Sequence, residues 1–153
     1  MRPAGRGPAS PRRFAMDCLA RREHSAAELR CKLAARDFTA DEIDATLARL
    51  EQDGLLSDAR FAQAFVAWRH RRGQGPLRLR AELAQRGVTA ELIDESLEGV
   101  DWHGAARAAR EKKFGPELPA QYADKARQAR FLQYRGFDPE QIQRALAGGW
   151  EQD

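Results

Sequence analysis

Long apolar runs are absent from this sequence. No stretch approaches the roughly 20 consecutive apolar residues that a membrane-spanning helix needs, and the N-terminus lacks the apolar segment of a signal peptide. We therefore expect a cytoplasmic protein that does not enter membranes. Cysteine is also scarce, since Cys18 and Cys31 are the only two. In a reducing compartment we expect both thiols to be buried as small apolar side chains, without a disulfide or a metal ion.

Residues that usually carry out catalysis are equally sparse. The three histidines, His24, His70 and His103, have neither the spacing of a metal-binding pair nor an obvious nucleophile as partner. Gly73 and Gly75 occur close together, but the Lys-Ser/Thr that completes a phosphate-binding loop is missing. The sequence therefore predicts a protein that is not an enzyme and that has no cofactor or metal site.

Aromatic residues are few, at 8% of the 153 residues. Leucine, isoleucine and alanine must therefore supply most of the core, and they recur at helical spacing. No segment alternates apolar and polar residues as a half-buried strand would. These patterns predict an all-α protein without a sheet.

Charge is unevenly distributed along the chain, although the net charge is only +3. Residues 37–58 contain seven acids and one base, whereas residues 59–86 contain seven arginines and one acid, Glu82. A solvated helix face normally interleaves acids and bases to limit repulsion. The arginine-rich segment therefore favours a binding surface for an acidic partner.

An internal repeat explains most of the remaining sequence. Residues 25–47 align with residues 75–97 without gaps and share ten identities at a constant offset of fifty. A fainter third copy places Leu132, Arg135 and Phe137 on the positions of residues 33, 36 and 38. The chain is therefore expected to consist of three similar units.

Each unit is expected to form three short helices. Ser25 with Glu28, and Thr39 with Glu42, have the spacing of a capping box, which marks a helix start. Units this small bury little core alone, so we expect neighbours to pack on one another in an elongated array. The expected boundaries are a disordered basic tail at 1–11, repeats at 12–56, 57–100 and 101–149, and a C-terminal tail at 150–153.

The middle unit combines an aromatic helix face with basic residues. Phe61, Phe65 and Trp68 share one face, which we interpret as core rather than as a platform for stacking bases. Gly73 ends this helix, and Gly75-Pro76 starts the next one. With the basic residues of the third unit, the predicted partner-binding surface comprises Arg69, Arg71, Arg72, Arg78, Arg80, Arg86, Lys112, Lys113, Arg127, Arg130 and Arg135.

The segment from Leu56 to Val88 resembles the central motif of the RecX family, regulatory proteins of the bacterial recombinase RecA. The resemblance rests on the pattern LSDxRFAxxFVxxRxxxGQGPxRLxAELxxRGV and extends over nearly the whole chain. It implies a protein that lies in the helical groove of the RecA filament on DNA and contacts more than one protomer. It further implies inhibition of filament extension, of strand exchange and of ATP hydrolysis.

Charge alone leaves two partners open. A basic surface on an elongated helical array suits either an acidic groove on a protein filament or the phosphates of nucleic acid. With the resemblance, we expect a monomer that binds the RecA filament, with weak binding of single- or double-stranded DNA in addition. The alternative is a direct, sequence-indifferent DNA- or RNA-binding helical module.

Overall fold

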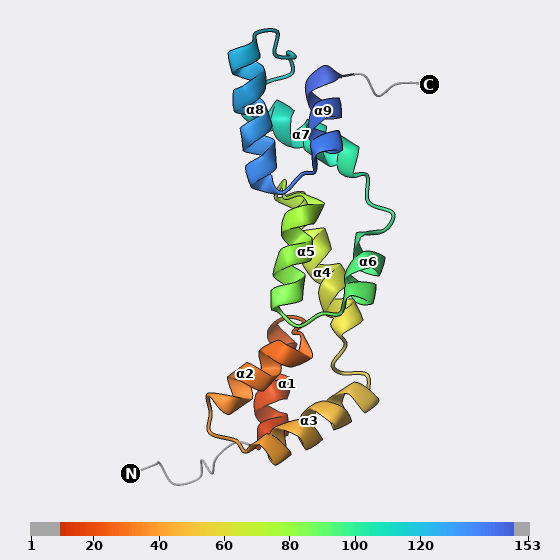
Figure 1. The fold of residues 1–153 in the computed structure, drawn as a ribbon. Coiled ribbons are helices and arrows are strands. Elements are labelled where there is room, and N and C mark those ends of the chain that lie inside the picture. The colour runs from red at the N-terminus through yellow and green to blue at the C-terminus, as the bar shows by residue number, and fades with distance from the viewer. Residues whose placement is uncertain (1–9, 149–153) are drawn as a thin grey trace.

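The computed structural model describes residues 10–148, and this part of the chain forms nine α-helices without a strand. The helices group into three successive units of three, stacked into a rod (Figure 1). The expected all-α, elongated array of three tandem units is confirmed. The helices are α1 (Pro11–Arg21), α2 (Ala26–Ala34), α3 (Ala40–Gln52), α4 (Asp58–Arg71), α5 (Pro76–Gln85), α6 (Ala90–Leu97), α7 (Trp102–Phe114), α8 (Tyr122–Arg135) and α9 (Pro139–Ala147).

The two expected tails lie almost wholly outside the described residues. At the N-terminal boundary, Ser10 caps α1 by accepting a hydrogen bond from the backbone N–H of Arg13, and Pro11 is the first helical residue. Helix α1 therefore begins one residue earlier than the sequence suggested. No helix between residues 10 and 148 combines the length and the apolar character that crossing a bilayer would require.

Capping side chains fix where the helices begin. Both predicted capping boxes form, because Ser25 and Thr39 exchange hydrogen bonds with Glu28 and Glu42 at the starts of α2 and α3. Such a cap contributes about 1 kcal/mol to helix stability. Asp138 forms a third box at the start of α9. The capping residues thereby set the lengths of the helices and the places where the chain turns.

Each unit has its own apolar core. Leu29 and Leu33 are fully buried in the first unit, Leu79 and Leu83 in the second, and Leu132 in the third. Every substantial helix–helix contact joins helices of the same unit. The units therefore meet at helix ends rather than along broad apolar faces, which differs from the packing expected from the sequence. Among the described side chains, Trp102 packs against both the second and the third core.

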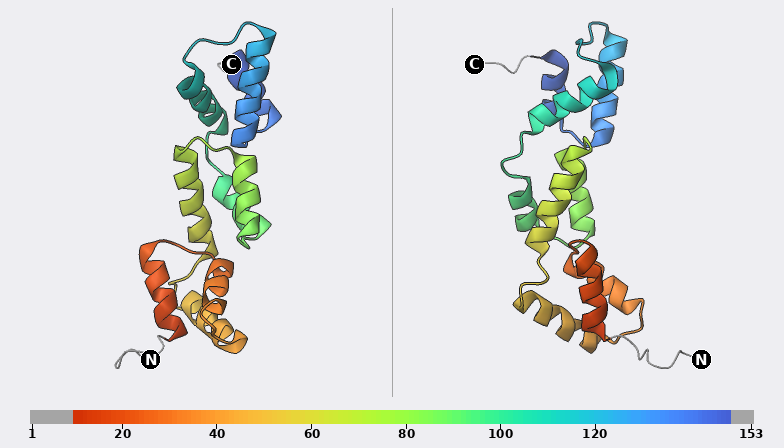
Figure 2. Two further views of the ribbon diagram at one scale, coloured as in Figure 1. Left: turned by 90° about the vertical axis from the view of Figure 1, so that its left-hand side faces the viewer. Right: turned by 180° about the vertical axis from the view of Figure 1, so that it is seen from behind.

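The second helices of the three units stand end to end and form a column along the rod (Figures 1 and 2). At the first junction the Ser25 hydroxyl, at the start of α2, donates to the Arg86 carbonyl at the end of α5, 2.8 Å away. At the second junction the backbone N–H of Gly75, at the start of α5, donates to the Arg135 carbonyl of α8, also at 2.8 Å. Arg86 and Arg135 occupy the same repeat position, so the two junctions use the same backbone carbonyl as hydrogen-bond acceptor.

Two glycines make these junctions possible. Gly87 and Gly136 follow the ends of α5 and α8 with φ angles of 81° and 101°, and a Cβ atom on either would overlap the neighbouring unit. Asp37 occupies the same repeat position in the first unit. It is the one described non-glycine residue with a positive φ, of 66°, and it lies in the connection between α2 and α3.

The cysteines depart in part from expectation. Cys18 is half-buried against the first core, but Cys31 is exposed, so the prediction that both thiols are buried is wrong for Cys31. Cys31 lies on α2 two residues from the buried Leu29 and Leu33, on the side of the helix that faces solvent. Both thiols are free.

Candidate partner-binding surface

The predicted basic residues fall into two groups. In the first group, internal carboxylates neutralise the arginines. Arg69 and Arg78 both pair with Glu82, at 2.7 and 3.0 Å, and Arg80 pairs with Asp94 at 2.6 Å. The single acid of the arginine-rich segment is thus the centre of an ion-pair cluster that helps to hold α4 against α5.

Two further members of the predicted set also have carboxylate partners. The Arg86 guanidinium lies 3.6 Å from a carboxylate oxygen of Glu28, which links the second unit to the first. Arg127 lies 3.5 Å from Asp124, one turn away on α8. For these residues an internal structural role is as good an explanation as partner binding.

The second group has no such neutralisation. Within residues 10–148 no carboxylate lies within ion-pair distance of six predicted cations. Five of them, all except Arg130, lie where the second and third units meet. The six are Arg71, Arg72, Lys112, Lys113, Arg130 and Arg135.

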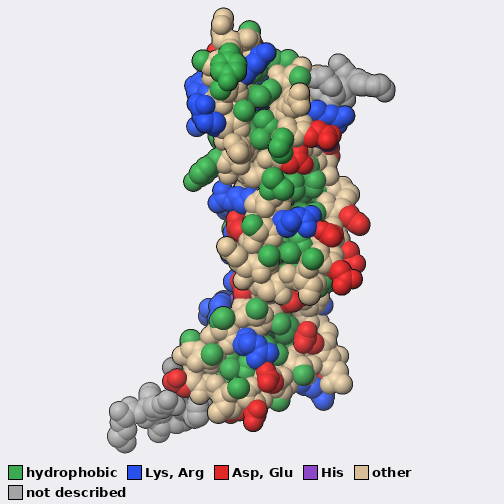
Figure 3. All heavy atoms as spheres, in the orientation of Figure 1, with side chains coloured by type: hydrophobic (Ala, Val, Ile, Leu, Met, Phe, Trp, Pro, Cys, Tyr) green, Lys and Arg blue, Asp and Glu red, His purple; other side chains and the backbone are tan. Residues whose placement is uncertain are grey.

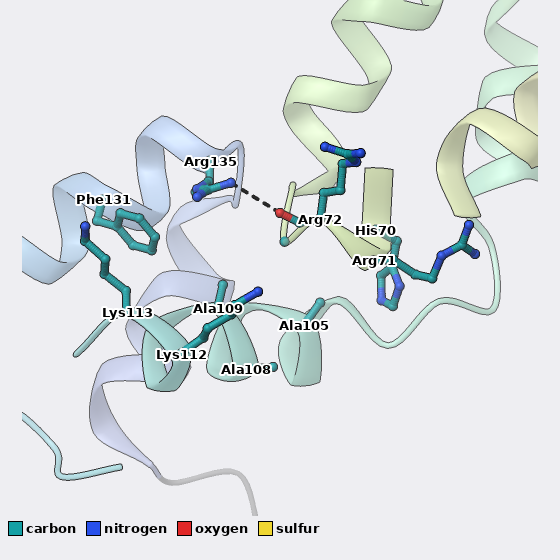
Figure 4. A pocket seen from close by; sticks show the side chains of 11 residues that line it. His70, Arg71, Arg72, Ala105, Ala108, Ala109, Lys112, Lys113, Phe131 and Arg135 are labelled. Carbon is teal, nitrogen blue, oxygen red and sulfur yellow. Dashed lines mark hydrogen bonds between the residues drawn. The ribbon is translucent and has the colours of Figure 1, made fainter. Parts of the chain in front are cut away.

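A groove of about 630 Å³ lies at this junction, between the C-terminal end of α4 and the helices α7 and α8 (Figure 4). Lys112, Lys113 and Arg135 surround its alanine floor, whereas Arg71 points away from the alanines. Arg135 also donates a hydrogen bond to the Arg72 carbonyl across the junction, at 3.2 Å. The residues that line the groove are His70, Arg71, Arg72, Gly73, Ala105, Ala108, Ala109, Lys112, Lys113, Phe131 and Arg135.

An equivalent groove of about 500 Å³ lies between the first and second units. Ala62 and Ala106 are both fully buried, and aligning them places α4 on α7 at an offset of 44. In this register Phe61 and Phe65 correspond to Ala105 and Ala109. The residues that line this second groove are Arg22, Glu23, Glu28, Phe61, Ala64, Phe65, Trp68, Arg69 and Arg86.

The groove between the first two units has an aromatic floor and carries its own acidic side chains. Phe61 and Phe65 lie buried in its floor, with exposed fractions of 4% and 8%. Burial raises the pKa of Glu28, but hydrogen bonds from Arg22 and from the Ser25 backbone N–H outweigh this effect and lower the pKa below its usual value. Glu28 is therefore an anion at neutral pH and partly neutralises the basic wall of this groove.

Trp68 does not belong to the core. Its side chain is 45% exposed, with the guanidinium groups of Arg69 and Arg72 at 5.1 and 4.5 Å from the ring centroid. The interpretation of all three aromatic residues as core is thus correct for Phe61 and Phe65 and wrong for Trp68. Trp68 lies in the last turn of α4, further along the same face, where its side chain remains open to solvent.

Charge on the visible face is segregated in patches rather than in one continuous basic stripe (Figure 3). Acidic side chains gather along the edge of the middle unit near α6, and basic side chains gather on the third unit. Because Glu82 and Asp94 pair with arginines of α4 and α5, the basic surface predicted from the sequence is partly neutralised in the middle unit.

Sequence reasoning identified the cations of the junction but missed its floor. Ala105 and Ala109 attracted no attention because alanine carries no chemistry of its own. Aligning α7 with α4 on their buried alanines would have found them, because Ala105 and Ala109 then take the positions of two phenylalanines. The floor matters because two methyl groups, in place of two phenyl rings, lie beside three cations.

A rod of tandem three-helix units with grooves at its junctions defines a helical-repeat binding protein. Three family models match this chain: the first, second and third three-helix domains of RecX, over residues 12–50, 57–97 and 104–146. These matches cover most of the chain, which belongs to the RecX family of regulatory proteins.

Relatives and solved structures agree with this assignment. The chain is 46% identical to regulatory protein RecX of Halorhodospira halophila, over 100% of this chain and 96% of the relative. It is 45% identical to regulatory protein RecX of Pseudomonas fluorescens, over 90% of each chain. The crystal structure of RecX from Lactobacillus salivarius is similar with a TM-score of 0.77 at 18% identity, covering 90% of this chain and 93% of that one.

Proposed function

We propose that this chain binds the RecA filament on single-stranded DNA and inhibits filament extension, ATP hydrolysis and strand exchange. Membership of the RecX family, whose members are non-enzymatic inhibitors of RecA, supports the partner and the effect. The observation that supports a particular contact site on this molecule is the groove at the junction of the second and third units. There Lys112, Lys113 and Arg135 lie together, and no carboxylate in the described part of the chain is within ion-pair distance of them.

The elongated shape supports a mode of binding that spans several sites. Three rigidly linked units convert later contacts into intramolecular ones, which raises the overall affinity without new contacts. A monomer of this shape, located in the cytoplasm with the filament, is the form that we propose to be active. Each unit then adds a modest contact, and the array as a whole retards protomer addition.

Titration into RecA filaments tests this function directly. The chain is added to RecA on single-stranded DNA, and ATP hydrolysis is followed; we expect the rate to fall as the chain reaches micromolar concentration. The same titration without RecA measures any hydrolysis by the chain itself, which we expect to be zero. An unchanged rate at micromolar excess would contradict the proposal.

Weak, sequence-indifferent binding of single-stranded DNA is a second candidate function. Tyr134 on α8 is 82% exposed, and Arg130 lies one turn away on the same helix. An exposed aromatic ring beside a free cation suits base stacking with phosphate contact. Replacing Tyr134 with Ala should weaken binding of a labelled oligothymidine but leave inhibition of pre-formed filaments intact.

A further inference from the structure

We propose that the groove between the second and third units receives an acidic segment of a RecA protomer that carries a bulky apolar side chain beside its carboxylates. This inference rests on the proposed function and specifies the partner element at that site. It comes from comparing the two junction grooves of this chain, which are built from the same repeat positions.

The apolar part of the occupant follows from the floors of the two grooves. Phe61 and Phe65 fill the floor between the first and second units, where they are buried. Ala105 and Ala109 stand at the same positions of the next groove, which therefore lacks two phenyl rings. A space of this shape, lined by alanine methyl groups and by Phe131, is complementary to one bulky apolar side chain of a partner.

The acidic part follows from the charges around each floor. Glu23 and Glu28 line the first groove, where Glu28 accepts hydrogen bonds from Arg22 and lies near Arg86. Aligning the buried Ala15 with the buried Ala62 places His70 on the position of Glu23, and the repeat alignment places Arg78 on the position of Glu28. The next groove thus keeps the basic wall but has lost both acids.

Three cations are left to be neutralised by the occupant. Arg135 corresponds to Arg86, and Lys112 and Lys113 extend from α7 beside the alanine floor (Figure 4). Carboxylates of a partner would take the place that Glu28 occupies in the first groove. Complementary charge of this kind fixes the register of an interface and raises the rate of encounter.

A protein segment fits this groove better than nucleic acid does. Phe131 is the phenyl ring in the lining, and Lys113 and Arg135 lie over it, 5.9 and 5.2 Å from the centroid. The imidazole of His70, also in the lining, packs edge-on with Trp102 at 5.5 Å. The ring faces are thus occupied and do not offer a stacking platform for a base. Phosphates would meet the cations but would leave the apolar floor unfilled.

Filling the groove from within tests the apolar part. The double substitution Ala105→Phe with Ala109→Phe gives the third unit the floor that the second unit already has. We expect a folded, helical chain whose affinity for RecA filaments on single-stranded DNA falls at least tenfold. The matched control is Ala123→Phe, at an exposed position on α8 outside the groove, which should bind as the wild type does. Wild-type affinity of the folded double variant would overturn the inference.

Reversing the charge tests the acidic part without changing the floor. Lys112→Glu with Lys113→Glu should weaken filament binding at least tenfold. The control pair Lys125→Glu with Arg144→Glu makes the same change in net charge at exposed positions outside the groove, and we expect it to alter binding less than threefold. Equal losses for the two pairs would reduce the effect to overall charge and overturn the assignment to the groove.

A photo-crosslinking amino acid at Ala108, on the exposed rim, identifies the occupant in the assembled complex. With full-length chain on RecA filaments, we expect crosslinks to a RecA peptide of net negative charge that contains a bulky apolar residue. Crosslinks to DNA, or to a basic RecA peptide, would overturn the inference. If the chain inhibits RecA but either result is obtained, only this inference fails. If the chain neither binds nor inhibits the filament, the proposed function itself fails.

Discussion

Gly75 and Gly136 touch backbone to backbone across the junction of the second and third units. A Cβ atom on Gly75 would lie 2.5 Å from the carbonyl carbon of Gly136, well inside van der Waals contact. The backbone N–H of Leu77 donates to the Gly136 carbonyl at 2.9 Å, which holds the two segments in this position. The geometry of the groove therefore depends on the absence of a side chain at Gly75.

We expect Gly75→Ala to destabilise the protein by about 1–3 kcal/mol, as overpacking at a close contact typically does. Urea denaturation measures the loss, and small-angle scattering should detect a bend at the junction. Gly75→Ser is the matched control, because serine caps the start of α5 as Ser25 caps α2, but it retains the Cβ atom. If Gly75→Ser were as stable as the wild type, the Cβ atom would be tolerated at this position and the close contact would not explain the alanine result.

Replacing Asp37 with Gly should stabilise the first unit. Asp37 adopts a φ of 66°, a conformation that costs a residue with a Cβ atom about 1 kcal/mol and costs glycine nothing. Thermal unfolding should therefore shift to higher temperature for Asp37→Gly. Asp37→Ala, which removes the charge but keeps the Cβ atom, should not be stabilised. A gain for the alanine variant equal to that for glycine would attribute the effect to charge.

The stability of the first unit should depend on pH through His24. The His24 side chain is 2% exposed, its Nδ1–H donates to the Arg22 carbonyl at 3.0 Å, and its Nε2 accepts from the Lys32 ammonium at 2.9 Å. Burial lowers the pKa of His24, and the charges of Arg22 and Lys32 lower it further, against the opposing effect of the carbonyl. The folded state therefore favours the neutral ring.

Below the unfolded value of about 6.5 the unfolded chain binds the proton more readily, so stability should fall with decreasing pH. The slope for one proton is at most about 1.4 kcal/mol per pH unit, and it ends once the pH is below the folded pKa. Urea denaturation between pH 5 and 7 measures it, with His24→Gln as the control that should lack this component. An equal slope for that variant would assign the pH dependence to other groups.

Arg110 should be essential for the loop between α7 and α8. Its guanidinium is 1% exposed and donates to the carbonyls of Gly115, Pro116 and Glu117 at 3.0–3.4 Å. Replacement with Leu leaves these carbonyls without their donor and should cost about 1–3 kcal/mol. Arg110→Lys should not restore stability, because one ammonium cannot reproduce the planar fork. Hydrogen exchange of the loop amides is the measurement, and unchanged protection in the leucine variant would argue against this role.

The number and order of helices could be read from the sequence because capping, spacing and repetition agree. Ser25, Thr39 and Asp138 begin helices through local hydrogen bonds, which depend on residues three positions apart. The repeat then fixed the third unit, although its own pattern is faint. Helix starts of this kind can be predicted without knowledge of the tertiary structure, because they depend only on residues close in sequence.

The binding surface was less predictable, because the fate of a charge depends on residues distant in sequence. Arg80 and Asp94 are fourteen residues apart, and Arg86 meets Glu28 of another unit. Counting basic residues along the sequence could not show which of them have a carboxylate partner, as these arginines do, and which do not, as with Lys112 and Lys113 among the described residues. Replacing Arg69, Arg72 and Arg78 together would be a poor test of binding, since Arg69 and Arg78 both pair with Glu82.

The column formed by α8, α5 and α2 gives the molecule a direction. In each junction the N-terminal end of one helix meets the C-terminal end of the next, so the opposed partial charges of the helix ends cancel there. Uncancelled ends remain at the start of α8 and at the end of α2, and they are of opposite sign. The rod thus has a head and a tail, and on a filament that is itself polar the two possible orientations are different complexes with different energies.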